Sequence, residues 1–117
     1  MANDIVRVVL MPKDADADTA GDRQIILDLK IDSDTNTSTG PFPAFGRVGD
    51  FRKPDTLYSF TLMGDGRMDY GAYASDAQRQ DKLEIRTAPL SVGGEVSYKV
   101  GDASHAYTVA SLTPLLP

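Results

Sequence analysis

The chain of 117 residues contains no cysteine, no tryptophan and a single histidine. Without cysteine it forms no disulfide, thiolate metal site or cysteine nucleophile. Cysteine usage therefore does not distinguish an oxidising from a reducing compartment. One histidine without cysteine argues against zinc. Stability must therefore come from packing, with aromatic bulk supplied by tyrosine and phenylalanine.

Long hydrophobic runs and a basic surplus are also absent. No apolar run approaches the roughly 18 residues of a membrane span. The first residues lack the basic region and long apolar stretch of a secretory signal, so we expect either cytoplasmic synthesis or a leader removed before residue 1. We expect no membrane partner. The 12 basic and 17 acidic residues give a net charge of −5, which argues against a nucleic-acid partner.

The sequence does contain strand-like segments separated by Gly-, Asp- and Pro-rich turns. This pattern predicts a single all-β domain over residues 1–117, a small antiparallel β-sandwich or barrel of about seven strands. One short helical turn is expected at 75–81, where Ser75 can cap it. The predicted strands cover residues 4–11, 24–32, 56–63, 67–74, 82–87, 95–100 and 105–112.

The segment 24–32 shows the clearest alternation. Its odd positions from 25 to 31 are Ile, Leu, Leu and Ile, and its even positions from 28 are charged, with Ile26 as the exception. A period of two predicts a strand with one buried face and one solvated face. Two hairpins are expected, around residues 64–66 and 101–104, because glycine supplies the positive φ that tight turns require.

Two segments without strand periodicity carry apolar residues. A long loop is predicted at 33–53, and an apolar tail at 113–117, where prolines flank two leucines. A loop this long indicates a function, disorder or an undetected strand. We expect these segments to pack on the core or on another chain, with an interface formed by Phe42, Phe45, Phe51, Leu112, Leu115 and Leu116.

Two acidic runs have alternating oxygen-bearing side chains. The first contains Asp14, Asp16, Asp18 and Asp22, and the second contains Asp32, Asp34 and Asn36. Calcium prefers several such ligands, so calcium is the one cofactor that the sequence suggests. The glycine and glutamate of an EF-hand loop are missing, and the alternative is a solvated acidic turn. The runs flank one strand and are expected at its opposite ends.

Catalytic groups do not converge in the sequence. His105 is expected at a hairpin end, and its neighbour Ser104 would point to the opposite face of a strand. A nucleophile, an oriented base and oxyanion donors are not recognisable, so we expect no enzymatic activity.

These observations favour a non-enzymatic structural or interaction protein, a β-domain that assembles with itself or binds another protein. A virion subunit (coat, decoration or tail) or a subunit of another particle would suit this architecture. One alternative is a calcium- or carbohydrate-binding module. A further alternative is a small acidic inhibitor or immunity-type protein that covers a basic partner.

Overall fold

The structure is a computed structural model that describes residues 3–13, 24–40, 44–49, 57–70, 81–86, 89–100 and 103–115. All regular secondary structure in these residues is strand, which confirms the all-β class. The strands are β1 (Asn3–Pro12), β2 (Gln24–Asp32), β3 (Thr37–Ser38), β4 (Ala44–Gly49), β5 (Tyr58–Leu62), β6 (Met68–Asp69), β7 (Asp81–Glu84), β8 (Glu95–Val100) and β9 (Ala103–Pro114).

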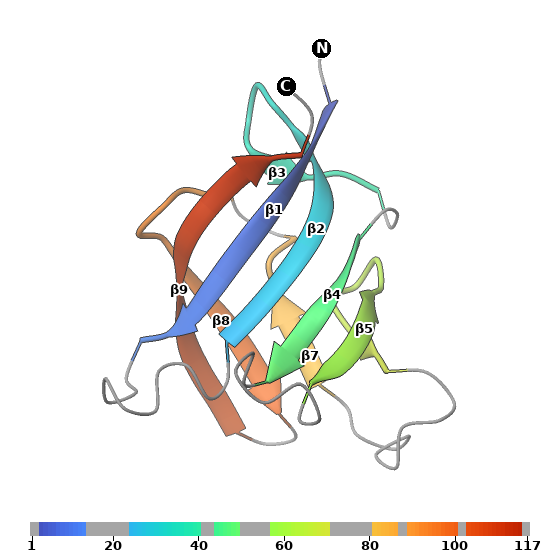
Figure 1. Cartoon of the computed structure of the whole chain (residues 1–117), viewed down its shortest axis with the longest axis vertical. Coiled ribbons are helices and arrows are strands. Elements are labelled where there is room, and N and C mark those ends of the chain that lie inside the picture. The colour runs from blue at the N-terminus through green and yellow to red at the C-terminus, as the bar shows by residue number, and fades with distance from the viewer. Residues whose placement is uncertain are drawn as a thin grey trace.

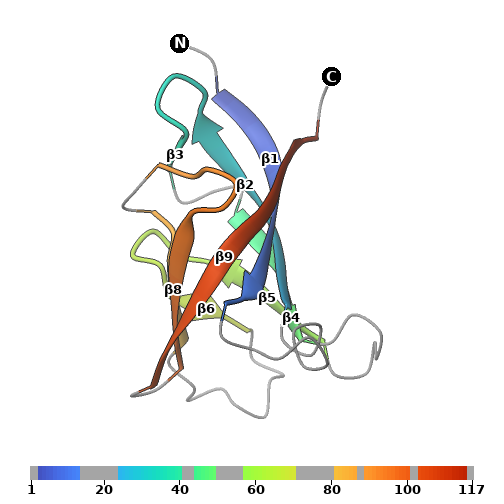
Figure 2. The ribbon, with the colours of Figure 1, turned by 90° about the vertical axis from the view of Figure 1, so that its left-hand side faces the viewer.

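The strands form one antiparallel sheet that curls into a nearly closed barrel (Figures 1 and 2). Their order is β6-β5-β4-β2-β1-β9-β8-β7, and β3 pairs with β2 outside this path. The two end strands approach each other at the isolated bridge between Arg67 and Lys82. The Leu83 amide also donates to the Gly66 carbonyl, at 2.8 Å. Closure therefore leaves only a short seam between β6 and β7.

The core follows from the alternation along β1 and β2. The odd positions of β2 from 25 to 31 are all at most 5% exposed, as the sequence predicted. The β1 partners of Ile25, Leu27 and Leu29 are Leu10, Val8 and Val6, which are equally buried, while Ile31 pairs with the exposed Asp4 at the end of the strand. Ile26 faces outward and is only half-buried. The inward positions of β5 to β9 complete the barrel interior with Phe60, Leu62, Met68, Leu83, Val96, Tyr98, Tyr107 and Val109.

The predicted long loop at 33–53 is corrected, because β3 and β4 lie within it. β4 is an internal strand, paired with β2 on one side and β5 on the other. Its inward positions are Ala44, Gly46 and Val48, so it lacks the large alternating side chains that mark a strand in sequence. These two strands raise the predicted seven to nine.

The start of the predicted tail belongs to β9. Val6 and Arg7 pair with Pro114 and Thr113, and the Leu115 amide donates to the Ile5 carbonyl, at 2.9 Å. Along β9, only residues 103–108 pair with β8. Pro114 at the end of β9 therefore removes no hydrogen bond from the pairing of β9 with β8.

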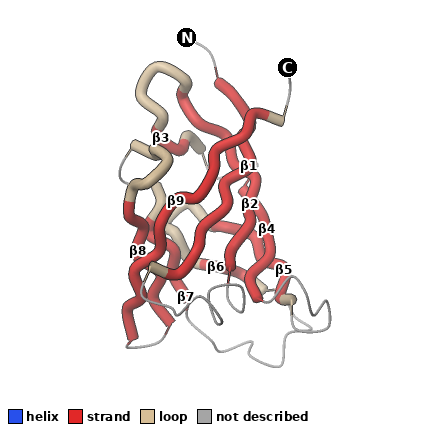
Figure 3. Tube along the Cα trace, turned by 60° about the vertical axis from the view of Figure 1, so that its left-hand side comes forward, coloured by secondary structure: helices blue, strands red, loops and turns tan. Residues whose placement is uncertain are grey.

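Among the described residues there is no helix (Figure 3), and hence none long and apolar enough to cross a membrane. Asp81, the last residue of the predicted helical turn, begins β7. The rest of that turn, residues 75–80, lies outside the described residues.

Candidate functional site

A groove of about 610 Å³ crosses the outer face of the sheet, over β2, β4 and β5, with β1 and β6 at its ends. In Figure 1 this part of the barrel wall faces the viewer. Because side chains on a strand alternate between faces, the outward residues of neighbouring strands stand in rows across the sheet. Two such rows border the groove, and we call this surface the groove face.

The first row contains the ring of Phe45. The register places Arg7, Asp28, Phe45, Thr61 and Asp69 side by side on β1, β2, β4, β5 and β6. Phe45 is 51% exposed, although its strand is internal to the sheet. The fold therefore leaves this large ring half in water on the outer face of the sheet.

The second row lies two residues further along β4. It consists of Val9, Ile26, Arg47 and Ser59. The Arg47 side chain forms no hydrogen bond or ion pair with any residue in the described part of the chain. The groove face thus combines apolar side chains with an exposed guanidinium.

Gly46 lies between the two rows on β4. A Cβ atom here would collide with the Ile26 carbonyl and approach the Leu27 Cα and Cβ to 2.6 Å. Only glycine allows β4 to approach β2 so closely, which is the usual meaning of glycine inside a strand. The sequence placed this glycine in the predicted loop 33–53, and the structure shows it as a requirement of the packing of β4 on β2.

One end of the first row is held by an ion pair. The Arg7 guanidinium donates from Nε and Nη2 to the two carboxylate oxygens of Asp28, at 2.9 and 3.0 Å. The hydrogen bonds and charge of Asp28 raise the pKa of Arg7. The bidentate geometry fixes the plane of the guanidinium on the sheet surface. This pair orders the groove wall, but it forms no catalytic constellation.

Inside the barrel, Asp81 is buried to 1% exposure at the start of β7. The hydroxyl groups of Tyr70 and Tyr98 both donate to its Oδ2, at 2.5 and 3.0 Å. Burial, and then the hydrogen bond to Asp81, raise the pKa of Tyr70 well above its ordinary range. These bonds join β7 to β8 and to the segment after β6, so they stabilise the seam of the barrel.

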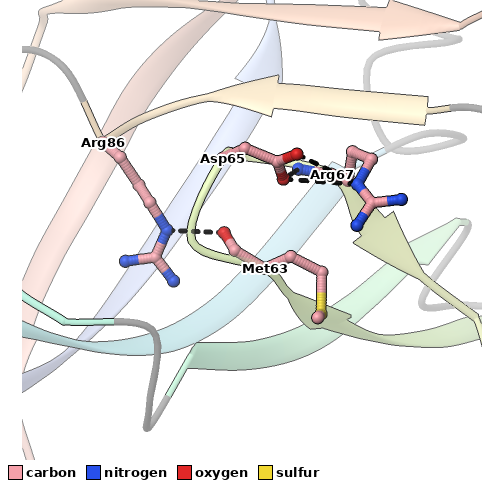
Figure 4. A network of polar contacts seen from close by, with 4 residues as sticks. All are labelled: Met63, Asp65, Arg67 and Arg86. Carbon is pink, nitrogen blue, oxygen red and sulfur yellow. Dashed lines mark hydrogen bonds and ion pairs between the residues drawn. The ribbon is translucent and has the colours of Figure 1, made fainter.

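A second polar network covers one end of the barrel (Figure 4). The Arg86 guanidinium donates to the Met63 and Leu62 carbonyls, at 2.8 and 3.0 Å. It also donates to Ser38 Oγ and the Gly40 carbonyl, both at 2.6 Å. Its burial lowers the pKa of Arg86. Since the donors are used by these acceptors, we assign this arginine a structural role.

The hairpin beside Arg86 is closed by Asp65. This carboxylate accepts from the backbone amide of Arg67 at 3.1 Å and from its side-chain Nε at 3.1 Å. The backbone hydrogen bond is the main cause of the lowered pKa of Asp65. Figure 4 shows Asp65 and Arg67 in this turn. The two predicted glycines, Gly64 and Gly66, flank Asp65 in the sequence.

The structure describes only part of the predicted calcium ligands. Asp14, Asp16, Asp18 and Asp22 lie outside the described residues. In the second run, Asp32 Oδ1 accepts a hydrogen bond from the Asp34 amide, at 2.9 Å. This is the hydrogen bond of an Asx turn, in which the aspartate side chain binds the backbone two residues on. Asn36 takes the left-handed conformation, with φ of 56°. No group of three potential metal ligands is found in the described ranges, and calcium binding stays a prediction.

The three predicted interface residues that the structure describes do not gather at one place. Phe42, Phe51 and Leu116 lie outside the described residues. Leu112 packs against the chain's own core, Leu115 is 40% exposed beside β1, and Phe45 lies on the groove face. Sequence reasoning missed the partners of Phe45 on that face. The one available signal was Ile26, the outward apolar residue that breaks the alternation of β2.

His105 is exposed on β9, and its ring lies 6.5 Å from that of Tyr98. Tyr98 and Tyr107 are buried and meet edge to face, as core aromatics do. These two tyrosines therefore contribute bulk to the barrel interior.

Searches against protein-family models, curated proteins and solved structures found no match to this chain.

Proposed function

We propose that this chain is a non-enzymatic interaction protein that assembles with copies of itself. The observation that carries the proposal is the half-exposed ring of Phe45 beside Arg47 on the outer face of an internal strand. Aromatic residues and arginine are enriched in protein interfaces and supply much of their binding energy. Within the described residues, neither side chain takes part in a hydrogen bond, an ion pair or a ring contact.

A subunit of a virion or another particle is the setting that we propose for this assembly. The support for it is architectural analogy: compact β-domains tile shells and tubes through their faces. Closure of the sheet at the seam leaves few strand edges for pairing, so faces are the surfaces through which such a subunit would associate.

The test is sedimentation equilibrium from about 20 μM to about 1 mM, the range in which weak interfaces become populated. We expect the weight-average mass to rise above the monomer mass of 12.6 kDa as concentration increases. A mass that stays at the monomer value throughout would refute the proposal.

A carbohydrate-binding module is the second candidate. The groove pairs an exposed ring with hydroxyl, carboxylate and guanidinium groups, a combination that fits the apolar face and hydroxyl groups of a sugar. Titration calorimetry with maltohexaose, cellohexaose and chitohexaose tests this function. Binding that Phe45→Ala abolishes would support it, and the absence of heat with all three would count against it.

The calcium expectation has its own test. Thermal melting with and without about 5 mM calcium covers the affinities of weak extracellular sites. A rise in melting temperature would support a site, and an unchanged melting temperature would end the idea.

A further inference from the structure

We infer that copies of this chain join head to tail, with the turn between β2 and β3 of one copy inserted into the groove of the next, where Asp34 pairs with Arg47. This inference rests on the proposed self-association and specifies both of its surfaces. The two surfaces lie on different parts of the chain, so the contact is heterologous, and each copy supplies one turn and one groove.

On the groove side, Arg47 carries a charge that the other lining residues leave uncompensated. Asp28 is bound by Arg7 through hydrogen bonds of 2.9 and 3.0 Å, and Asp69 interacts with its own chain. Arg47 is exposed, and its side chain forms no hydrogen bond or ion pair with the residues that the structure describes. The groove therefore offers a guanidinium to an incoming carboxylate, the acceptor that its planar fork suits best.

On the turn side, Asp34 offers such a carboxylate. Residues 34–36 are exposed, and the Asp34 side chain forms no hydrogen bond or ion pair within the described ranges. The turn projects at the end of the barrel where the two termini lie (Figures 2 and 3). Asp28, in the groove, lies four residues before the end of β2, about 13 Å along the strand, so the turn does not reach the groove of its own chain.

The turn is already ordered in the single chain. Asp32 Oδ1 accepts from the Asp34 amide, at 2.9 Å, and the Asp32 carbonyl accepts from the amides of Thr35 and Asn36, at 3.2 and 2.6 Å. The Asn36 carbonyl accepts from the Leu90 amide, at 2.8 Å, which ties the turn to the segment before β8. An ordered turn loses little conformational entropy when it binds, so this contact avoids much of the usual cost of association.

Shape and charge favour this contact over one between two groove faces. The sheet is curled, so two such faces would touch only along a narrow strip and would bring their Arg47 guanidiniums together. The groove, of about 610 Å³, is large enough for a few side chains of a projecting turn, which would also cover the ring of Phe45. The whole chain carries −5, and pairing a negative turn with Arg47 opposes the general repulsion between copies.

A heterologous contact does not stop at a dimer. Each copy leaves an unoccupied turn at one end and an unoccupied groove at the other, so the assembly continues into a ring or a helical filament. One turn buries much less than the about 800 Å² per partner of stable complexes, so we expect a dissociation constant on the order of hundreds of micromolar. At about 1 mM the weight-average mass should therefore exceed twice the monomer mass of 12.6 kDa.

The experiment is sedimentation equilibrium of two full-length variants, each of which blocks one half of the contact. Asp34→Ala removes the carboxylate of the turn, and Arg47→Asp places a carboxylate in the groove. We expect each variant alone to associate about tenfold more weakly than the wild type, or worse, because a charge-assisted contact is lost. Asp4→Ala and Lys99→Asp are the matched controls, since they change the net charge equally at exposed sites outside both surfaces, and they should associate like the wild type.

Mixing the two variants tests the head-to-tail arrangement itself. The Arg47→Asp chain keeps a wild-type turn, and the Asp34→Ala chain keeps a wild-type groove, so an equimolar mixture retains one intact contact. We expect the mixture to form dimers that neither variant forms alone at the same total concentration, and no larger species, because the second contact is blocked.

The outcomes separate this inference from the function beneath it. If Asp34→Ala associates as strongly as the wild type, the turn is not the occupant of the groove, and self-association stands. If both variants are weakened and their mixture forms no dimer, the head-to-tail pairing is wrong. If the wild type stays monomeric, the proposed function itself fails. Circular dichroism of every variant verifies that the barrel remains folded.

Discussion

Replacing Tyr70 by phenylalanine tests whether the buried Asp81 cluster stabilises the seam of the barrel. The variant keeps the ring and removes only the hydroxyl that donates to Asp81 Oδ2 at 2.5 Å. Hydrogen bonds to charged groups contribute about 1.5–3 kcal/mol, and Asp81 is 1% exposed, so water does not replace the donor easily. We expect a loss of about 2 kcal/mol in the free energy of unfolding, measured by urea denaturation at pH 7.

Tyr98→Phe removes the second donor to the same oxygen and serves as the comparison. The two losses should not be additive, because either hydroxyl alone leaves the carboxylate one charge-assisted bond. A loss below about 0.5 kcal/mol in each single variant would refute the view that these bonds stabilise the seam.

Alkaline pH gives an independent measurement of the same contact. Burial, followed by the hydrogen bond to Asp81, raises the pKa of Tyr70 above its ordinary value of 10. The unfolded chain therefore loses this proton first, and the stabilising contribution, complete below pH 10, is lost as the pH rises. The advantage of wild type over Tyr70→Phe should shrink by at most about 1.4 kcal/mol per pH unit above 10, less solvent screening of a part-buried group. An unchanged difference up to pH 11 would contradict this assignment.

Three further substitutions test the fold around the groove and the covered end of the barrel. Gly46→Ala should lower the free energy of unfolding, measured by urea denaturation, by about 1–3 kcal/mol or more, because the new Cβ meets the backbone of β2. An unchanged free energy of unfolding would contradict the close packing of β2 and β4. Arg86→Lys should lower the free energy of unfolding by about 2 kcal/mol and loosen β3, since an ammonium cannot reach all four acceptors. Faster amide hydrogen exchange in residues 37–40 would show the loosening, and unchanged exchange would contradict the role of this network. Asp65 has a lowered pKa, so its contribution to stability is present above its ordinary value of 3.8 and is lost as the pH falls through the lowered value. The advantage of wild type over Asp65→Asn should therefore decline in acid denaturation below about pH 4, and a difference independent of pH would refute the role of this turn.

Much of the fold could be predicted from sequence because alternation is a local signal. The four inward residues of β2 and the inward residues of β8 and β9 follow the period of two directly. β4 escaped prediction for a physical reason: its inward positions are small because β2 lies against them. Its strand identity depends on a neighbour that the local pattern does not contain.

The groove face could not be predicted in the same way. Arg7 and Asp28 are 21 residues apart, and Arg47 and Asp69 meet this face only through the register of four strand pairs. Sequence singled out Phe45 as an interface residue, and the structure leaves its ring 51% exposed. It placed that ring in a loop, and it grouped the ring with tail residues that the structure separates from it.

The most direct test of the account is a dilution series followed by amide chemical shifts of uniformly labelled protein, from about 1 mM to about 20 μM. The account predicts concentration-dependent shifts that cluster on the groove face, at Phe45, Arg47, Ser59, Thr61 and Asp69, with β7 and β8 unaffected. Shifts confined to residues 112–115 would contradict it by placing the contact at the C-terminal part of β9. Spectra that do not change with concentration would contradict self-association altogether.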